Sequence, residues 1–242
     1  MAVSPFDSAL YRDLFHDAET GKLFTDSAEI RAMLLVEGAL ARAQGNAGLI
    51  PELSAAFIHR AAMEVQIDPA GLAAETGQSA VCIPALVKAF RKAVEAPEHA
   101  QYIHWGATSQ DIIDTGLVLR LRQALALFSG RLDNLLDALA KLADAHQALP
   151  MAARTWGQAA TPTSFGAVVA SWGQPLLRDR ARLAEMRPRV LQVSLSGASG
   201  TLSAMVPHGA EIRAALADAL GLHDPGESWH STRDGLAELS GW

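Results

Sequence analysis

Apolar side chains recur every three or four positions between residues 117 and 142, and this pattern constrains the fold more than any other feature of the chain. A period near 3.5 predicts one continuous amphipathic helix whose apolar seam must pack against other helices. The helix is predicted to run from residue 111 to about residue 148, a length of about 55 Å. Because this is too long for a compact monomer, we expect a long helical bundle that other subunits complete. The seam consists of Leu117, Leu121, Leu125, Phe128, Leu132, Leu135, Leu139 and Leu142.

Further helices are predicted on both sides of this one. Residues 26–47 show helical spacing, with Asp26 or Ser27 as the cap. A second long helix is expected to begin with Thr161 as its cap and Pro162 in its first position. Because no run of alternating apolar and polar residues has a useful length, the fold class is predicted to be all-α. Shorter helices are expected at 52–64, 68–75, 80–95 and 210–220.

The pattern predicts two domains. Residues 1–100 contain short helices separated by prolines and glycines, and are expected to form a small N-terminal helical domain. Residues 101–242 are expected to form the central domain, built from the long helices. A hydrophobic content of 50% in 242 residues is ample for a core.

Composition excludes several classes of function. The net charge is −6 and basic residues alternate with acids, which argues against a nucleic-acid partner. Cys82 is the only cysteine, so the chain has no internal disulfide and no cysteine-based zinc cluster, which favours a cytoplasmic protein. The longest uncharged window, residues 155–177, contains prolines and amides and is interpreted as buried protein, not as a membrane helix.

Chemically useful side chains gather at one predicted helix start. Residues 104–115 read His-Trp-Gly-Ala-Thr-Ser-Gln-Asp-Ile-Ile-Asp-Thr. Thr108 or Ser109 can cap the helix, and the negative charges of Asp111 and Asp114 suit the positive end of its dipole. The glycine permits close approach of the backbone, and the hydroxyls can donate hydrogen bonds to a carboxylate. The segment therefore indicates an anion site, with a purely structural helix cap as the alternative.

This segment resembles the first signature of the fumarase/aspartase superfamily. Residues 154–166, Arg-Thr-Trp-Gly-Gln-Ala-Ala-Thr-Pro-Thr-Ser-Phe-Gly, resemble its second signature. The lyases of the superfamily carry a histidine that protonates the leaving group where this chain has Trp156, and an indole cannot transfer a proton in this way. Tryptophan at this position is similar to the pattern of the 3-carboxy-cis,cis-muconate cycloisomerase branch. The resemblance extends over nearly the whole chain.

The resemblance implies an isomerase that converts 3-carboxy-cis,cis-muconate to 4-carboxymuconolactone in protocatechuate degradation, the β-ketoadipate pathway. In this reaction a carboxylate of the substrate adds to a double bond of the same molecule. The leaving group of the reverse reaction is then a carboxylate, which needs no acid at position 156. Two alternatives remain: a fumarate-releasing lyase of the adenylosuccinate or argininosuccinate type, and a non-catalytic helical interaction module.

Both signatures are implied to supply substrate-binding residues. Their hydroxyls and amide can stabilise a carbanion beside a carboxylate, and a guanidinium can bind a carboxylate with two hydrogen bonds. Alternatively, Thr108 and Thr155 are helix caps, Arg154 forms a surface ion pair and Trp156 packs in a core. No metal-ligand spacing is present, and the family implies no cofactor. The implied substrate-binding residues are His104, Thr108, Ser109, Arg154, Thr155, Trp156 and Gln158.

The family resemblance also implies partners. It predicts a small polycarboxylate substrate and a homotetramer whose active sites combine segments of several subunits. The serine base belongs to a third signature, which residues 203–208 match poorly, so we expect it beyond Trp242. A chain that ends at Trp242 is then expected to lack the serine loop and the C-terminal domain, and to be inactive by itself.

Overall fold

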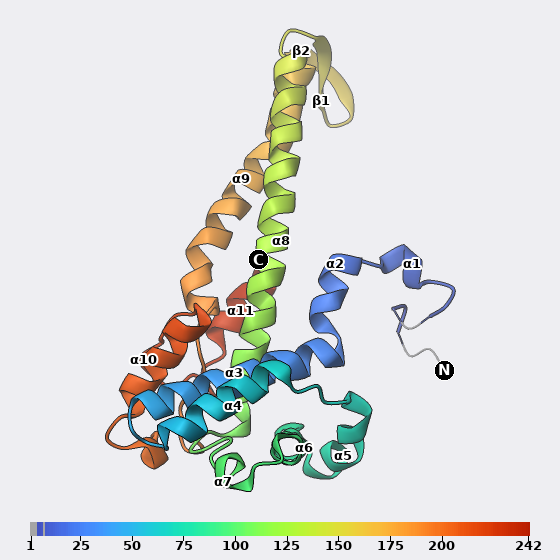
Figure 1. Ribbon diagram of the computed structural model, residues 1–242. Helices are drawn as coiled ribbons and strands as arrows, with labels where there is room; N and C mark the ends of the chain where they lie inside the picture. Colours follow the sequence, from blue (N-terminus) through green and yellow to red (C-terminus); the bar gives the residue numbers. More distant parts are fainter. Residues whose placement is uncertain (1–3, 7) are drawn as a thin grey trace. The chain divides into compact units, whose positions relative to one another are not determined.

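Figure 1 shows the computed structural model of the chain, which describes residues 4–6 and 8–242. Helices dominate the structure, as predicted. The elements that precede the longest helix are α1 (Arg12–Phe15), α2 (Ala18–Gly21), η1 (Lys22–Phe24), α3 (Asp26–Asn46), α4 (Glu52–Glu64), η2 (Pro69–Leu72), α5 (Ala73–Ser79), α6 (Ile83–Val94) and α7 (Pro97–Ala100). They are followed by α8 (Ser109–Ala145), β1 (Pro150–Thr155), β2 (Gln158–Ser164), α9 (Phe165–Val190), η3 (Ser203–Met205), α10 (Gly209–Leu220) and α11 (Asp234–Gly241).

The chain forms two compact units, which are described separately. The first unit comprises the described residues up to Ala124 together with Pro188–Asp234, and the second comprises Leu125–Arg187 and Gly235–Trp242. Helix α8 therefore starts in the first unit and continues into the second. The domain boundary near residue 100 stays a prediction. No helix among the described residues is both long enough and apolar enough to cross a membrane.

The first unit depends on a close contact between α3 and α4. A Cβ atom added to Gly38 would lie 2.7 Å from the Cβ of Ala62, and one added to Gly45 would lie 2.3 Å from the Cβ of Ala55. Glycine at these two positions therefore lets the two helix backbones approach closely. Helix α10 also packs against α3. Side chains of this unit that are almost fully buried are Met33, Leu34, Leu40, Ile58, Ile83, Leu86, Phe90, Ile103 and Ile112.

Several predicted helices are confirmed within one or two residues. Helix α3 begins at residue 26, and α4 and α10 match the predicted segments 52–64 and 210–220. The predicted cap of α3 is wrong, because Oγ1 of Thr25 accepts the hydrogen bond from the backbone N–H of Ala28 at 3.2 Å. Thr25 directly precedes the first helical residue, which is the usual position for such a cap.

A buried carboxylate, Asp111, joins three segments of the first unit. Its Oδ1 atom accepts hydrogen bonds from the backbone N–H of Ser196 and from Nε2 of His230, each at 2.8 Å. Its Oδ2 atom accepts from the backbone N–H groups of Thr108 and Gly197, each at 3.0 Å. The bond to Thr108 is one half of a capping box, in which the third helical residue satisfies the backbone of the cap. The sequence predicted only that Asp111 complements the helix dipole, whereas in the structure its carboxylate also joins three segments of the first unit.

The next turn of α8 carries a second anchor. Both carboxylate oxygens of Asp114 accept hydrogen bonds from the guanidinium of Arg233, at 2.6 and 2.9 Å. The guanidinium carbon lies 4.9 Å from the centre of the Trp229 ring. The indole of Trp229 in turn donates to the carbonyl of Val193 at 2.8 Å. Residues 229–233 are thus held against the start of α8 and the segment that follows α9.

The second unit contains a β-hairpin between α8 and α9. Strands β1 and β2 pair antiparallel, with Thr155 opposite Gln158. The two residues between them, Trp156 and Gly157, have φ angles of 49° and 76°. Positive φ at both central residues is typical of the tight turns that join twisted strands.

The hairpin corrects two predictions. Residues 150–164 were predicted to contain no strand, and the second long helix was predicted to begin with Thr161 and Pro162. Both are wrong: Pro162 pairs with Ala152 in the sheet, and α9 begins at Phe165. Pairing across the hairpin satisfies backbone groups that a helix start would leave free. The helix cap is Ser164, whose Oγ accepts from the N–H of Ala167 at 3.2 Å.

We expect Asp111→Ala to destabilise the first unit by about 3–5 kcal/mol, because it leaves four donors without their buried acceptor. Urea unfolding followed by circular dichroism measures this change. The control is Asp218→Ala, an exposed aspartate on α10, which should alter the free energy of unfolding by less than about 0.5 kcal/mol. Equal stability of the two variants would contradict the assigned role of Asp111.

Candidate active site

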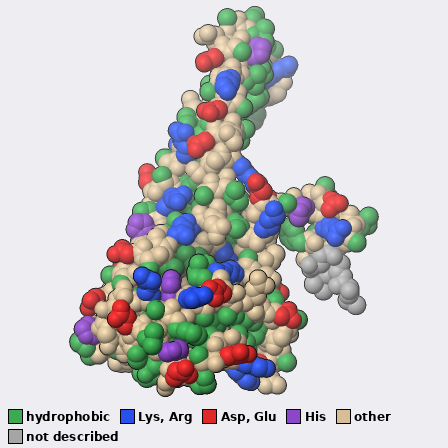
Figure 2. Space-filling view, in the orientation of Figure 1, with side chains coloured by type: hydrophobic (Ala, Val, Ile, Leu, Met, Phe, Trp, Pro, Cys, Tyr) green, Lys and Arg blue, Asp and Glu red, His purple; other side chains and the backbone are tan. Residues whose placement is uncertain are grey.

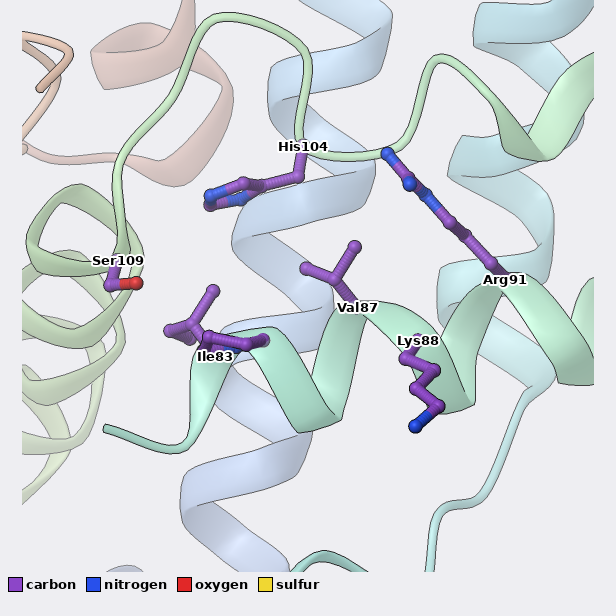
Figure 3. Close-up of a pocket in the computed structure, with 7 residues that line it drawn as sticks. Ile83, Val87, Lys88, Arg91, His104 and Ser109 are labelled. Carbon is purple, nitrogen blue, oxygen red and sulfur yellow. The ribbon is translucent and has the colours of Figure 1, made fainter. Parts of the chain in front are cut away.

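A cavity of about 470 Å³ in the first unit lies beside the first signature (Figure 3). Helix α6 forms one wall, and the other lining residues come from the loop before α8 and the first residue of that helix. The imidazole of His104 and the hydroxyl of Ser109 point toward the same space next to Ile83 and Val87, whereas Lys88 points away from them. The cavity therefore combines an apolar surface with a few polar groups, as small-molecule sites usually do. Its lining residues are Ile83, Pro84, Val87, Lys88, Arg91, His104 and Ser109.

Three hydrogen bonds from neighbouring helices hold the loop that carries His104. Nε2 of Gln44 on α3 donates to the carbonyl of Trp105 at 2.6 Å. Nη2 of Arg91 on α6 donates to the carbonyl of Ile103 at 2.8 Å, and a side-chain bond from α3 reaches His104 itself. His104 has a φ angle of 64°, in the left-handed region that costs a non-glycine residue free energy. These bonds stabilise that backbone conformation.

The third of these hydrogen bonds is donated by His104 to a buried carboxylate on α3. Nδ1 of His104 lies 2.7 Å from Oε1 of Glu37 on α3, whose side chain is 1% exposed. Burial lowers the pKa of His104, but the hydrogen bond and the charge of Glu37, with the charge of Asp111, outweigh burial and the opposing charge of Arg91. The net result is a raised pKa. The protonated ring therefore contributes stability below the ordinary histidine pKa, and this contribution is lost as the pH rises through the raised value.

Thr108 and Ser109 occupy different positions. Thr108 precedes the first residue of α8, and its backbone N–H and carbonyl both bond to Asp111. It is absent from the residues that line the cavity, whereas Ser109 lines it opposite His104. Of the first signature, the structure thus brings His104 and Ser109 together at the cavity, with Thr108 beside them in the backbone.

The residues predicted from the second signature lie on the hairpin of the second unit. Arg154 and Thr155 belong to β1, Gln158 to β2 and Trp156 to the turn between them. All four residues are exposed, and Trp156 is 100% exposed. The alternatives that Thr155 caps a helix and that Trp156 packs in a core are therefore wrong for this chain. The structure groups these four residues with one another, in a different unit from His104, Thr108 and Ser109.

Sequence reasoning missed three residues of this region: Glu37, Arg91 and His230. A signal for Glu37 was present, because it follows Ile30 and Leu34 on the apolar face of the predicted helix at 26–47. A charged side chain on such a face is rarely buried without a partner. Arg91 and His230 carried no comparable signal.

We expect Trp156→Phe to leave the free energy of unfolding of this chain unchanged within about 0.5 kcal/mol, because the side chain has no packing to lose. If Trp156 packed in a core, the same substitution would measurably lower the free energy of unfolding. The matched control is Leu136→Ala in the same unit, where the side chain is 8% exposed and the expected cost is roughly 2–5 kcal/mol. Chemical denaturation of both variants gives the comparison.

Comparison with known proteins places this chain among relatives of about twice its length. A 3-carboxy-cis,cis-muconate cycloisomerase of Pseudomonas aeruginosa is 42% identical over 236 residues, which cover 96% of this chain and 51% of the relative. The crystal structure of 3-carboxy-cis,cis-muconate lactonizing enzyme from Pseudomonas putida is 39% identical, with a TM-score of 0.91 over 97% of this chain and 54% of that one. A fumarate lyase from Mesorhizobium sp. BNC1 is 41% identical, with a TM-score of 0.89 over 93% of this chain and 53% of that one.

These similarities confirm the predicted fumarase/aspartase-like fold. The chain spans about half the length of the curated relatives it matches. A family model described as Lyase matches residues 16–242, which include both signatures. This match covers most of the chain, and the helical architecture agrees with it. The chain therefore belongs to this lyase family.

Proposed function

We propose that this protein is an isomerase that converts 3-carboxy-cis,cis-muconate to 4-carboxymuconolactone in protocatechuate degradation. The observation that carries the proposal is Trp156 at the turn of the exposed hairpin, the position at which the resemblance implies a proton-donating histidine in the lyases. A reaction whose leaving group is a carboxylate has no need for an acid there. The relatives named as cycloisomerases support the same choice.

The cavity in the first unit suits a polycarboxylate with an unsaturated carbon skeleton. Its apolar side, Ile83 and Val87, can contact the carbon chain. The imidazole of His104 and the hydroxyl of Ser109 can donate hydrogen bonds to carboxylate groups. Because the pKa of His104 is raised by Glu37, its ring adds positive charge to the site over a wider pH range.

The proposed reaction joins two parts of one substrate. A carboxylate oxygen forms a C–O bond to a carbon of the double bond, and the π electron pair moves to the neighbouring carbon beside another carboxylate. That carbon then takes up a proton. Donors fixed around the receiving carboxylate stabilise the intermediate charge. The resemblance assigns the proton transfer to a serine of the third signature.

We also propose that the hairpin serves the active site of another subunit in a homotetramer. Thr155, Gln158 and Arg154 are exposed donors next to Trp156. In that setting Arg154 would bind a substrate carboxylate, and Trp156 would exclude water. A cytoplasmic location also remains our proposal.

A fumarate-releasing lyase is the second candidate, and the similarity to the Mesorhizobium fumarate lyase favours it. Lyases that release an amine must protonate the departing nitrogen. Trp156 cannot supply this proton, since an indole N–H is a donor of hydrogen bonds only. The cycloisomerase is therefore the better supported candidate.

Turnover of 3-carboxy-cis,cis-muconate by the complete gene product tests the proposed function. We expect the absorbance of the conjugated diene to disappear as the lactone forms. Adenylosuccinate and argininosuccinate serve as control substrates, from which we expect no fumarate. Fumarate release from either substrate, without lactone formation, would replace the proposal with the lyase. No turnover of any of the three would favour an interaction module.

Apolar side chains, green in Figure 2, remain exposed on the second unit. Leu135 is 47% exposed, and on α9 Trp172 and Leu177 are 51% and 47% exposed. Contact with other copies of the chain would remove this apolar surface from water. We expect sedimentation velocity at micromolar concentration to detect tetramers, and Leu135→Lys to weaken them. Leu53→Lys, at an exposed position of the first unit, is the control. A compact monomer for the unaltered chain would refute the tetramer.

A further inference from the structure

We propose that Glu37 is a positioning residue of the cavity, which binds Nδ1 of His104 so that Nε2 of the same ring is left to bind a substrate carboxylate. This inference rests on the proposed function, since it assigns a polycarboxylate to the cavity. It adds a residue on α3 that belongs to neither signature.

The geometry determines where the ring carries its proton. Oε1 of Glu37 lies 2.7 Å from Nδ1 of His104. A carboxylate can only accept a hydrogen bond, so Nδ1 must be the donor in both charge states of the imidazole. When the ring is neutral, Nε2 is a bare acceptor that repels a carboxylate. When the ring is charged, Nε2 is a donor with a positive charge, which is the state that binds a carboxylate strongly.

The position of His104 suits this role. Its ring lines the cavity and points toward Ser109, away from Arg91 (Figure 3). The side chain of His104 is 18% exposed, so a ligand in the cavity can reach it, whereas Glu37 is 1% exposed and cannot meet the ligand itself. Glu37 therefore acts on a ligand only through the imidazole.

The charged groups around the ring come from three helices. Glu37 on α3 and Asp111 on α8 favour the imidazolium, and Arg91 on α6 opposes it. Lys88, also on α6, is paired with Glu75 at 2.9 Å and points away from His104. Asp111 already accepts four hydrogen bonds, including one from His230. Glu37 is thus the acid whose hydrogen bond is directed at this imidazole.

The side chain of Glu37 also has an unpaired buried oxygen. Its second oxygen, Oε2, is buried and has no hydrogen-bond partner among the described residues. Buried polar atoms in proteins are nearly always paired, because an unpaired one costs free energy. The interaction of Glu37 with the protonated ring of His104 opposes this cost.

The first experiment measures the ring of His104 by long-range ¹⁵N–¹H NMR across pH. In the unaltered chain we expect a raised pKa and, in the neutral ring, a proton on Nδ1. Glu37→Gln should lower the pKa of His104 below its ordinary value. The variant removes the carboxylate charge that raises this pKa, and burial of the ring, which lowers it, remains. The matched control is Glu211→Gln, which removes the acid paired with exposed His208 at 3.1 Å and should leave His104 unchanged. An equal pKa of His104 in all three proteins would overturn the proposal.

The second experiment measures binding of propane-1,2,3-tricarboxylate through the resonances of His104. Binding to the unaltered chain should weaken as the pH rises through the pKa of His104. At a pH where that ring is charged, Glu37→Gln should weaken binding about tenfold or more, and Glu211→Gln should leave it unchanged. Binding that is independent of pH and of Glu37, or no binding to the unaltered chain, would overturn the proposal.

The two proposals fail in different ways. Turnover of 3-carboxy-cis,cis-muconate with binding that ignores Glu37 would retain the proposed function and reject the role of Glu37. Binding that depends on Glu37, in a protein that does not form the lactone, would retain the role of Glu37 and reject the proposed function. If Glu37→Gln does not fold, the unaltered chain still decides, because a neutral ring protonated on Nε2 would overturn the proposal.

Discussion

The buried carboxylate of Asp111 is the interaction on which the first unit depends. It accepts hydrogen bonds from the start of α8, from residues 196 and 197 and from His230. An uncompensated charge in such a place would cost several kcal/mol, so the carboxylate and its donors each require the others. Because one of these donors is the backbone of Thr108, the same interaction orients the loop that carries His104. The cavity thus takes its form from a network that does not itself line it.

Burial and the charge of Glu37 have opposite effects on the pKa of His104, and their balance sets the charge of the site. An apolar wall next to an imidazole favours the neutral ring. The structure reverses this with a carboxylate that is more deeply buried than the imidazole. A cation beside an apolar surface is suited to a ligand that has both carboxylates and unsaturated carbons. The proposed substrate has this combination.

The second unit exposes the residues of the second signature, including Trp156, the position at which this chain differs from the lyases. A tight turn places Trp156 at the tip of a hairpin, and the strands hold Thr155 and Gln158 opposite each other. The helices on either side of the hairpin approach each other closely, since a Cβ atom on Gly166 of α9 would lie 2.4 Å from the carbonyl oxygen of Ala143 of α8. Large exposed apolar side chains such as Trp156 are typical of a surface that contacts another molecule.

The sequence by itself determined the helices and the family, because helical periodicity and signature residues are local properties. It therefore predicted α3, α4, α8 and α10, and it named His104 and Ser109 as site residues. Only the tertiary structure decided the hairpin at 150–164, where pairing across the turn overrides a good helix-start signal. It also decided the partner of His104, since Glu37 lies 67 residues away in the chain. Such contacts depend on how distant segments pack, and no local pattern encodes them.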